Sequence, residues 1–146
     1  MRLEPENDRL ISSKPHILIL EDTESEKIIY RHLLAFEYNV TSVASWPEAQ
    51  KALANDTYHL VLIDLSLPDP ESFAICKELK TNQSTKALPI IFITPKEALR
   101  EKLASLSLTE DDFLSKPANP LQLKAKIYAR VRDVKIETPP ALKLAS

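Results

Sequence analysis

The 146-residue sequence contains no glycine, although about 7% of the residues in an average protein are glycine. Glycine adopts positive φ angles more readily than any other residue, so turns and helix ends must use other residues here. Its absence also excludes the glycine-rich loops that bring the backbone close to nucleotide phosphates. We therefore do not expect a nucleotide-binding protein of that kind.

The chain has only one cysteine, and it lacks long apolar runs and an excess of charge. The single cysteine, Cys76, excludes an internal disulfide and suits the reducing cytoplasm, where we expect the protein to be located. No apolar run approaches the roughly 18 residues that span a bilayer, and residues 1–14 lack the apolar core of a signal peptide. The net charge of −2 provides no basic surface, so we expect no direct binding of nucleic acid or membrane.

Short apolar runs alternate with segments of helical periodicity over residues 15–137. The runs predict five buried strands, at residues 16–20, 38–43, 60–63, 89–93 and 113–114. Helices are expected after them, at about 24–36, 46–55, 71–80, 96–106 and 119–134. The alternation predicts an α/β fold with a five-stranded parallel sheet, doubly wound with helices on both faces. Residues 1–14 are expected to be a polar extension, and residues 138–146 a tail or linker.

Three of the predicted helices have recognisable starts. Thr23 and Glu26 have the spacing of a capping box, and so do Ser45 and Glu48, while Asn119 can cap the last helix. The positions that give the first helix its apolar periodicity, and so its expected buried face, are Ile28, Ile29, His32, Leu33, Leu34 and Phe36.

Polar side chains follow the predicted strands directly. Glu21 and Asp22 follow the first strand, Asp64 the third, Thr94 the fourth and Lys116 the fifth. The carboxyl ends of parallel strands meet at one edge of a sheet, where ligands bind near the switch in strand order. Neighbouring carboxylates repel one another, and a hard cation such as Mg²⁺ relieves that repulsion. A carboxylate can also attack phosphorus, with lysine and hydroxyl groups stabilising the developing charge.

Each of these residues also has an ordinary structural explanation. Glu21, Asp22 and Thr94 could cap helices, Asp64 could open a loop, and Lys116 could be a surface lysine. Their joint occurrence at successive strand ends favours a single site.

Over residues 16–132 the sequence resembles the response-regulator receiver family, which has a flavodoxin-like (βα)5 fold. The resemblance rests on the pair Glu21-Asp22, the stretch Leu60-Val-Leu-Ile-Asp-Leu-Ser-Leu-Pro68, Thr94, and the stretch Asp111-Asp-Phe-Leu-Ser-Lys-Pro117. It implies a phosphorylation-dependent switch whose partner is a histidine kinase or a phosphotransfer protein. It also implies an output by binding rather than by enzymatic turnover, with a dimer surface on the last two strand–helix units.

The resemblance also assigns roles to matching residues. Asp64 would accept the phosphoryl group, and Thr94 and Lys116 would contact it. Thr94 and Phe113 would form the switch pair, although Phe113 could equally be a core aromatic. The Lys116–Pro117 peptide bond would be cis, which proline makes inexpensive.

The same resemblance implies a Mg²⁺ site. Glu21, Asp22 and Asp64 would hold the ion together with the backbone carbonyl of Ser66. At least one of the two residues of the acidic pair would bind directly, and the other could bind through water.

Pro95 departs from the family pattern. The family usually has a small residue there, whose backbone N–H helps to hold the phosphoryl group, and proline has no N–H. Ser72 and Thr109 also replace glycines that the family favours. Pro95 predicts slower phosphorylation or an altered lifetime of the phosphorylated form, whereas Ser72 and Thr109 bear on loop geometry more than on chemistry.

Two other functions remain open at this stage. One is an interaction module of the same fold that works without phosphorylation, which Pro95 favours. The other is a Mg²⁺-dependent phosphatase with an aspartyl nucleophile. Such enzymes usually carry a second aspartate two residues after the nucleophile, and Ser66 stands at that position.

Overall fold

The computed structural model describes residues 14–64, 69–95, 113–116 and 118–134. Five parallel strands form one sheet in the order β2-β1-β3-β4-β5. The strands are β1 (His16–Leu20), β2 (Asn39–Val43), β3 (Leu60–Asp64), β4 (Ile90–Pro95) and β5 (Phe113–Lys116). The predicted five-stranded parallel sheet is therefore confirmed.

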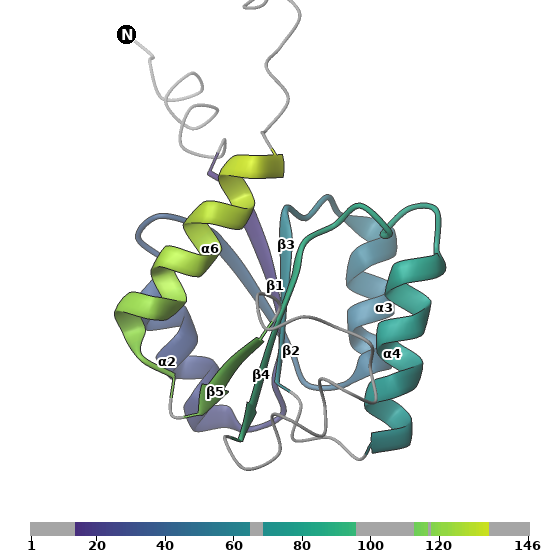
Figure 1. Cartoon of the computed structure of the whole chain (residues 1–146), viewed down its shortest axis with the longest axis horizontal. Helices are drawn as coiled ribbons and strands as arrows, with labels where there is room; N and C mark the ends of the chain where they lie inside the picture. Colours follow the sequence, from purple (N-terminus) through teal and green to yellow (C-terminus); the bar gives the residue numbers. More distant parts are fainter. Residues whose placement is uncertain (1–13, 65–68, 96–112, 117, 135–146) are drawn as a thin grey trace, which may run out of the picture.

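Helices lie on both faces of the sheet, as predicted (Figure 1). Helices α2 (Glu24–Leu34) and α6 (Pro120–Val134) cover one face, and α3 (Trp46–Asn55) and α4 (Asp69–Thr81) cover the other. The helix expected at residues 96–106 lies outside the described residues. No helix among the described residues is long and apolar enough to cross a membrane.

Each face of the sheet buries its own apolar cluster, because the side chains of a strand alternate between its two faces. Leu18, Leu20, Val61, Ile63, Ile90, Phe92 and Phe113 lie on the side of α3 and α4. Ile17, Ile19, Leu60, Leu62, Ile91, Ile93 and Leu114 lie on the side of α2 and α6. A sheet covered on both faces needs continuous apolar strands, which explains why β1, β3 and β4 carry their polar residues only near their ends.

Strands β4 and β5 are each longer at the carboxyl end than expected. β4 continues through Thr94 to Pro95, and β5 continues to Lys116, where they pair in register with each other. The polar residues expected to follow the strands are therefore held by the sheet itself. Helix α4 begins earlier than expected, at Asp69, because proline is tolerated in the first turn of a helix.

Two of the three expected helix starts are confirmed. The Oγ of Ser45 accepts a hydrogen bond from the backbone N–H of Glu48 at 3.3 Å. The Oδ1 of Asn119 accepts hydrogen bonds from the N–H groups of Leu121 and Gln122 at 2.8 and 3.2 Å. Each cap therefore satisfies N–H groups that have no partner inside the helix.

The capping box predicted for Thr23 and Glu26 is wrong. The side chain of Thr23 makes no capping hydrogen bond, although Thr23 is the N-cap residue of α2. Its backbone N–H donates instead to Oε2 of Glu21 at 2.9 Å. Since Glu21 already occupies that donor, the side chain of Glu26 is available for another contact.

The buried face predicted for the first helix is also largely wrong. Tyr30 and Leu34 are buried, whereas Ile28 is 61% exposed and Phe36 is 87% exposed. Helix α2 has apolar residues on two sides and can bury only one of them against the sheet. Phe36 lies beyond the end of the helix at Leu34, so helical spacing does not place it.

Helices α2 and α3 end without positive φ angles, so neither end needs a glycine. Ala35 ends α2 at φ −66°, and Asp56 ends α3 at φ −147°. Their N–H groups still reach back to helical carbonyls, those of Arg31 at 2.8 Å and Ala52 at 3.1 Å. These two helices therefore end in right-handed or extended backbone, where many helices end at a glycine with positive φ.

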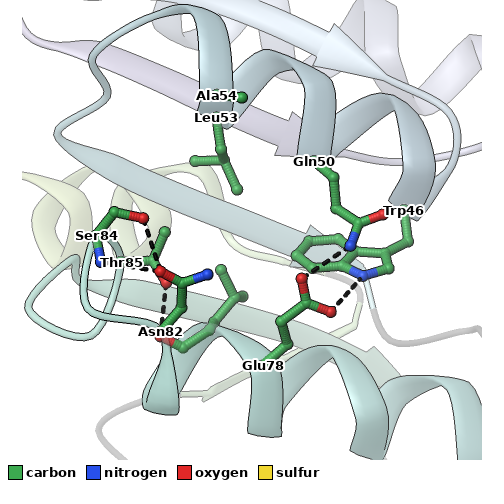
Figure 2. A pocket seen from close by; sticks show the side chains of 9 residues that line it. Trp46, Gln50, Leu53, Ala54, Glu78, Asn82, Ser84 and Thr85 are labelled. Carbon is green, nitrogen blue, oxygen red and sulfur yellow. Dashed lines mark hydrogen bonds between the residues drawn. The ribbon is translucent and has the colours of Figure 1, made fainter.

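Helices α3 and α4 are joined by the carboxylate of Glu78, which lies in the pocket between them (Figure 2). Its two oxygens accept hydrogen bonds from Nε1 of Trp46 at 3.3 Å and from Nε2 of Gln50 at 2.8 Å. At the other end of this pocket, Oδ1 of Asn82 accepts from the N–H and the hydroxyl of Ser84. Side-chain hydrogen bonds therefore reinforce the apolar packing of α3 and α4.

A partly buried histidine predicts a pH-dependent stability. Nδ1 of His59 accepts a hydrogen bond from the backbone N–H of His16 at 3.0 Å, which requires a neutral ring. Burial, and then the nearby His16, lower the pKa of His59 below 6.5, so the unfolded chain takes up a proton more readily than the folded one. The stability that His59 provides is complete above pH 6.5 and is lost as the pH falls below that value.

We expect His59→Asn to lose less stability on acidification than the wild type does, because the amide oxygen can accept the same hydrogen bond without titrating. Urea unfolding between pH 7 and pH 5 measures this difference. His32→Asn, at an exposed histidine of α2, is the matched control and should follow the wild type. Parallel curves for His59→Asn and the wild type would contradict the prediction.

Candidate functional site

Three carboxylates from two parts of the chain meet at the carboxyl edge of the sheet. Leu20 pairs with Ile63, so Glu21, directly after β1, and Asp64, the last residue of β3, lie at the same level. The first turn of α2 brings Glu26 to the same place, and carboxylate oxygens of Glu21, Glu26 and Asp64 lie within 4.8 Å of one another. Only 2% of Glu21 and 5% of Asp64 is exposed, so water screens this cluster poorly.

Lys116 provides the positive charge of the site. It is the last residue of β5, and its Nζ lies 2.5 Å from Oδ2 of Asp64 and 3.1 Å from Oε1 of Glu26. The ammonium therefore bridges a carboxylate from β3 and a carboxylate from α2. Both contacts are charge-assisted hydrogen bonds, which are stronger than those between neutral groups.

The carboxyls of Glu21 and Asp64 differ in their affinity for protons. Burial, reinforced by the neighbouring Asp64, raises the pKa of Glu21 to about 8. Burial also opposes the ionisation of Asp64, but hydrogen bonds from Glu21 and Lys116 outweigh it and hold the pKa of Asp64 below its usual value. Near neutral pH the proton therefore resides on Glu21, and Asp64 carries the negative charge of the pair.

Lys116 remains charged in this setting. Burial alone would lower its pKa, but the hydrogen bonds to Asp64 and Glu26 raise the pKa of the ammonium above its usual value. An ionised Asp64 beside a permanent cation is the arrangement that a nucleophilic carboxylate requires.

Thr94 and Phe113 occupy the positions that the sequence suggested. Thr94 is fully buried on β4, one residue beyond the partner of Asp64, and within the described chain its Oγ1 has no hydrogen-bond partner. Phe113 is buried, and its ring centroid lies 5.3 Å from that of Phe92. Phe113 is therefore a core aromatic in this structure, and the switch role of both residues stays a prediction.

Not every residue of the predicted metal site joins the cluster. Asp22 is exposed and does not belong to the group formed by Glu21, Glu26 and Asp64. Ser66 and Pro117 lie outside the described residues, so the structure does not place them. Sequence reasoning missed Glu26 because it assigned that residue to a capping box. The sequence signal for Glu26 was that it is an acidic residue in the first turn of the helix that follows Glu21-Asp22.

The residues that are present fit a divalent cation. Carboxylate oxygens are the ligands that Mg²⁺ prefers, and three of them come together here. Oε1 of the buried Glu21 has no hydrogen-bond partner among the described residues, which leaves it available as a ligand. A cation would also relieve the repulsion that raises the pKa of Glu21.

The fold and the site together define the class of the domain: a parallel α/β sheet of flavodoxin-like strand order with a carboxylate–lysine cluster at its carboxyl edge. The family model of the response regulator receiver domain matches residues 17–128. The chain therefore belongs to the response regulator receiver family, whose members serve as phosphoacceptors in two-component signalling.

Curated relatives share the match but are longer. The transcriptional regulatory protein GltR of Pseudomonas aeruginosa is 29% identical over 116 residues, which cover 80% of this chain and 48% of GltR. The response regulator PleD of Caulobacter vibrioides is 29% identical over 119 residues, covering 81% of this chain and 25% of PleD. The chain thus spans about half, or less, of the length of these relatives.

Solved structures agree on the fold. The signal receiver domain of a signal transduction histidine kinase from Syntrophus aciditrophicus gives a TM-score of 0.73 at 26% identity, covering 85% of this chain and 95% of that domain. A CheY-like receiver domain protein from Methanospirillum hungatei gives a TM-score of 0.70 at 26% identity, covering 83% and 96%.

Proposed function

We propose that this domain is a phosphorylation-dependent switch in which Asp64 accepts a phosphoryl group from a phosphohistidine of a kinase or a phosphotransfer protein. The observation that carries the proposal is the buried carboxylate of Asp64 with the ammonium of Lys116 at 2.5 Å. A buried carboxylate held ionised beside a cation is a nucleophile with its charge stabilisation already in place.

In the proposed step, a carboxylate oxygen of Asp64 attacks phosphorus as the bond between phosphorus and the histidine nitrogen breaks. The product is an acyl phosphate on Asp64 and a free imidazole on the donor. Lys116 stabilises the charge that develops on the phosphoryl oxygens, and the hydroxyl of Thr94, which has no partner among the described residues, is free to donate to them.

Metal binding follows from the same cluster. Glu21 and Asp64, with Asp22 and the carbonyl of Ser66 as the family resemblance suggests, would hold Mg²⁺. When bound, Mg²⁺ supplies positive charge that offsets the phosphoryl oxygens. The binding of a cation requires Glu21 to lose its proton.

The proposed output is a change of binding surface, in the cytoplasm, without enzymatic turnover by this domain. Thr94 and Phe113 lie on neighbouring strands, so a movement of the hydroxyl toward a modified Asp64 would make room for the aromatic ring. We place a dimer surface on the last two strand–helix units. Leu121 and Tyr128 of α6 support this placement, since they are 78% and 60% exposed.

A small-molecule phosphodonor tests the proposal. Incubation with acetyl phosphate and Mg²⁺ should add the mass of one phosphoryl group to the intact protein, and EDTA should prevent the gain. A folded protein that gains no mass under these conditions would contradict the proposed phosphoacceptor function.

Pro95 predicts a slow reaction. It ends β4 in register with Lys116, at a position where the family usually provides a backbone N–H for the phosphoryl group. We expect Pro95→Ala to accelerate phosphorylation by acetyl phosphate at least about tenfold, since a donor to developing charge is commonly worth more than that. Pro89→Ala, at the opposite end of the same strand, is the matched control. Equal rates for Pro95→Ala and the wild type would show that the missing N–H does not limit the reaction.

The same residue favours a second function, an interaction module that works without phosphorylation. In that case partner binding would be the same for the wild type and for Asp64→Asn. A partner that distinguishes phosphorylated from unphosphorylated protein would decide for the switch.

A further inference from the structure

Glu26 has no role in the family-based assignment, yet it is part of the site. Its Oε1 lies 3.1 Å from Nζ of Lys116, and it is one of the three clustered carboxylates. About a third of its side chain is exposed, so Glu26 sits at the mouth of the site while Asp64 lies at the base. Lys116 lies between them.

We propose that Glu26 is a positioning residue of the phosphoryl-transfer site, which holds the Lys116 ammonium against Asp64 and adds its carboxylate to the cation-binding charge. This inference rests on the proposed function and deepens it. It names a residue of α2, Glu26, through which this helix affects Asp64 by way of Lys116.

The geometry explains why a second carboxylate matters for Lys116. A lysine side chain is a flexible four-carbon chain that can direct its ammonium into water. Lys116 is about one quarter exposed, so solvent is within reach. Two anchors, Asp64 and Glu26, hold the ammonium at the site, and this lowers the entropy lost when it binds a phosphoryl group.

The alternative explanation of Glu26 as a helix cap does not apply. The N–H of Thr23, which a capping box would pair with Glu26, donates to Glu21 instead. Glu24, in the same helical turn, faces solvent with 80% of its side chain exposed and lies 3.7 Å from Lys27. The two acidic residues of this turn therefore differ in one respect that an experiment can use: only Glu26 contacts Lys116.

The charge of Glu26 has a consequence for the phosphorylated form. Formation of the acyl phosphate removes the charge of the Asp64 carboxylate and places a phosphoryl group of about −1.5 to −2 nearby. Lys116 then lies between that group and Glu26, and the repulsion between the two anions remains. Glu26 thus makes the site more dependent on a divalent cation than the pair of Asp64 and Lys116 alone would be.

The experiment compares the wild type, Glu26→Gln and the control Glu24→Gln. Each variant removes one charge from the same turn of α2, without changing the shape of the side chain. Calorimetric titration of the unphosphorylated protein with Mg²⁺ alone measures cation affinity. The NMR signal of the Lys116 ammonium, which exchange with water broadens, reports its confinement. Acetyl phosphate labelling with detection by intact mass follows as the third measurement.

We expect Glu26→Gln to raise the dissociation constant for Mg²⁺ about tenfold, as the loss of a supporting residue at a metal site commonly does. Its Lys116 ammonium signal should also broaden. Glu24→Gln should stay within about twofold of the wild type, because exposed charges have small effects.

Either of two results would overturn the inference: Glu26→Gln matching the wild type in both Mg²⁺ affinity and the Lys116 signal, or Glu24→Gln matching Glu26→Gln. The labelling experiment separates this from a failure of the proposed function. If the wild type gains no phosphoryl group, the proposed function is wrong. If the wild type gains a phosphoryl group and Glu26→Gln matches it in all three measurements, only the role of Glu26 is wrong.

Discussion

Asp64→Asn is expected to remain folded and to lose the phosphoryl gain completely. The acceptor must be an ionised carboxylate, and hydrogen bonds from Glu21 and Lys116 keep Asp64 in that form despite its burial. An amide oxygen is a far poorer nucleophile toward phosphorus, and among the residues that the structure describes no other carboxylate lies as close to Lys116. Intact mass after treatment with acetyl phosphate and Mg²⁺ measures the loss.

The matched control for this substitution is Asp56→Asn, at the exposed end of α3, which should retain the full gain. Circular dichroism should show the same folded state for both variants. The fold should survive because Lys116 keeps a carboxylate partner in Glu26. A mass gain that persists in Asp64→Asn would place the acceptor elsewhere, with Glu21, Asp22 and Glu26 as the next residues to replace.

Phe92→Ala is expected to be the most destabilising single substitution that we predict for the core. Its ring is 1% exposed, lies in the cluster between the sheet and helices α3 and α4, and packs against Phe113. Truncation of a buried phenylalanine costs about 3–5 kcal/mol, because it removes apolar contacts and leaves a cavity. Urea unfolding followed by circular dichroism measures the free energy of unfolding.

The same substitution at Phe36 provides the control. That ring is 87% exposed, so Phe36→Ala should change the free energy of unfolding by no more than about 0.5 kcal/mol. Similar losses for the two variants would mean that the ring of Phe36 is covered in solution.

The strand ends were predictable because the signal there is unambiguous. Four of the five predicted strands, all but the second, stop abruptly at charged or hydroxyl residues, and a parallel sheet leaves only one edge where those residues can meet. Glu21, Asp64 and Lys116 were identified in this way, and the structure brings them together. Thr94 followed from the same reasoning, whereas Phe113, the first residue of β5, was singled out only by the family resemblance.

The first helix was less predictable because its sequence supports two geometries. Apolar residues occur on both sides of α2, and only packing against the sheet decides that Tyr30 and Leu34 are buried instead of Ile28 and Ile29. Glu26 was ambiguous for a related reason. Its spacing from Thr23 fits a capping box. Because the backbone N–H of Thr23 donates to Glu21, the carboxylate of Glu26 is available to contact Lys116. Such competition between partners is a tertiary effect and cannot be inferred from spacing.

The hydrogen bonds of Glu78, which join α3 and α4, give the protein an intrinsic fluorescent reporter. Trp46 is the only tryptophan of the chain, so the indole fluorescence comes from one ring whose N–H is bound to Glu78. Separation of the two helices would break that hydrogen bond and change the emission. Helix α2, which carries Glu26, lies on the other face of the sheet from Trp46 (Figure 1). A change of emission on adding Mg²⁺ would therefore show that cation binding at the acidic edge is transmitted to the α3–α4 face.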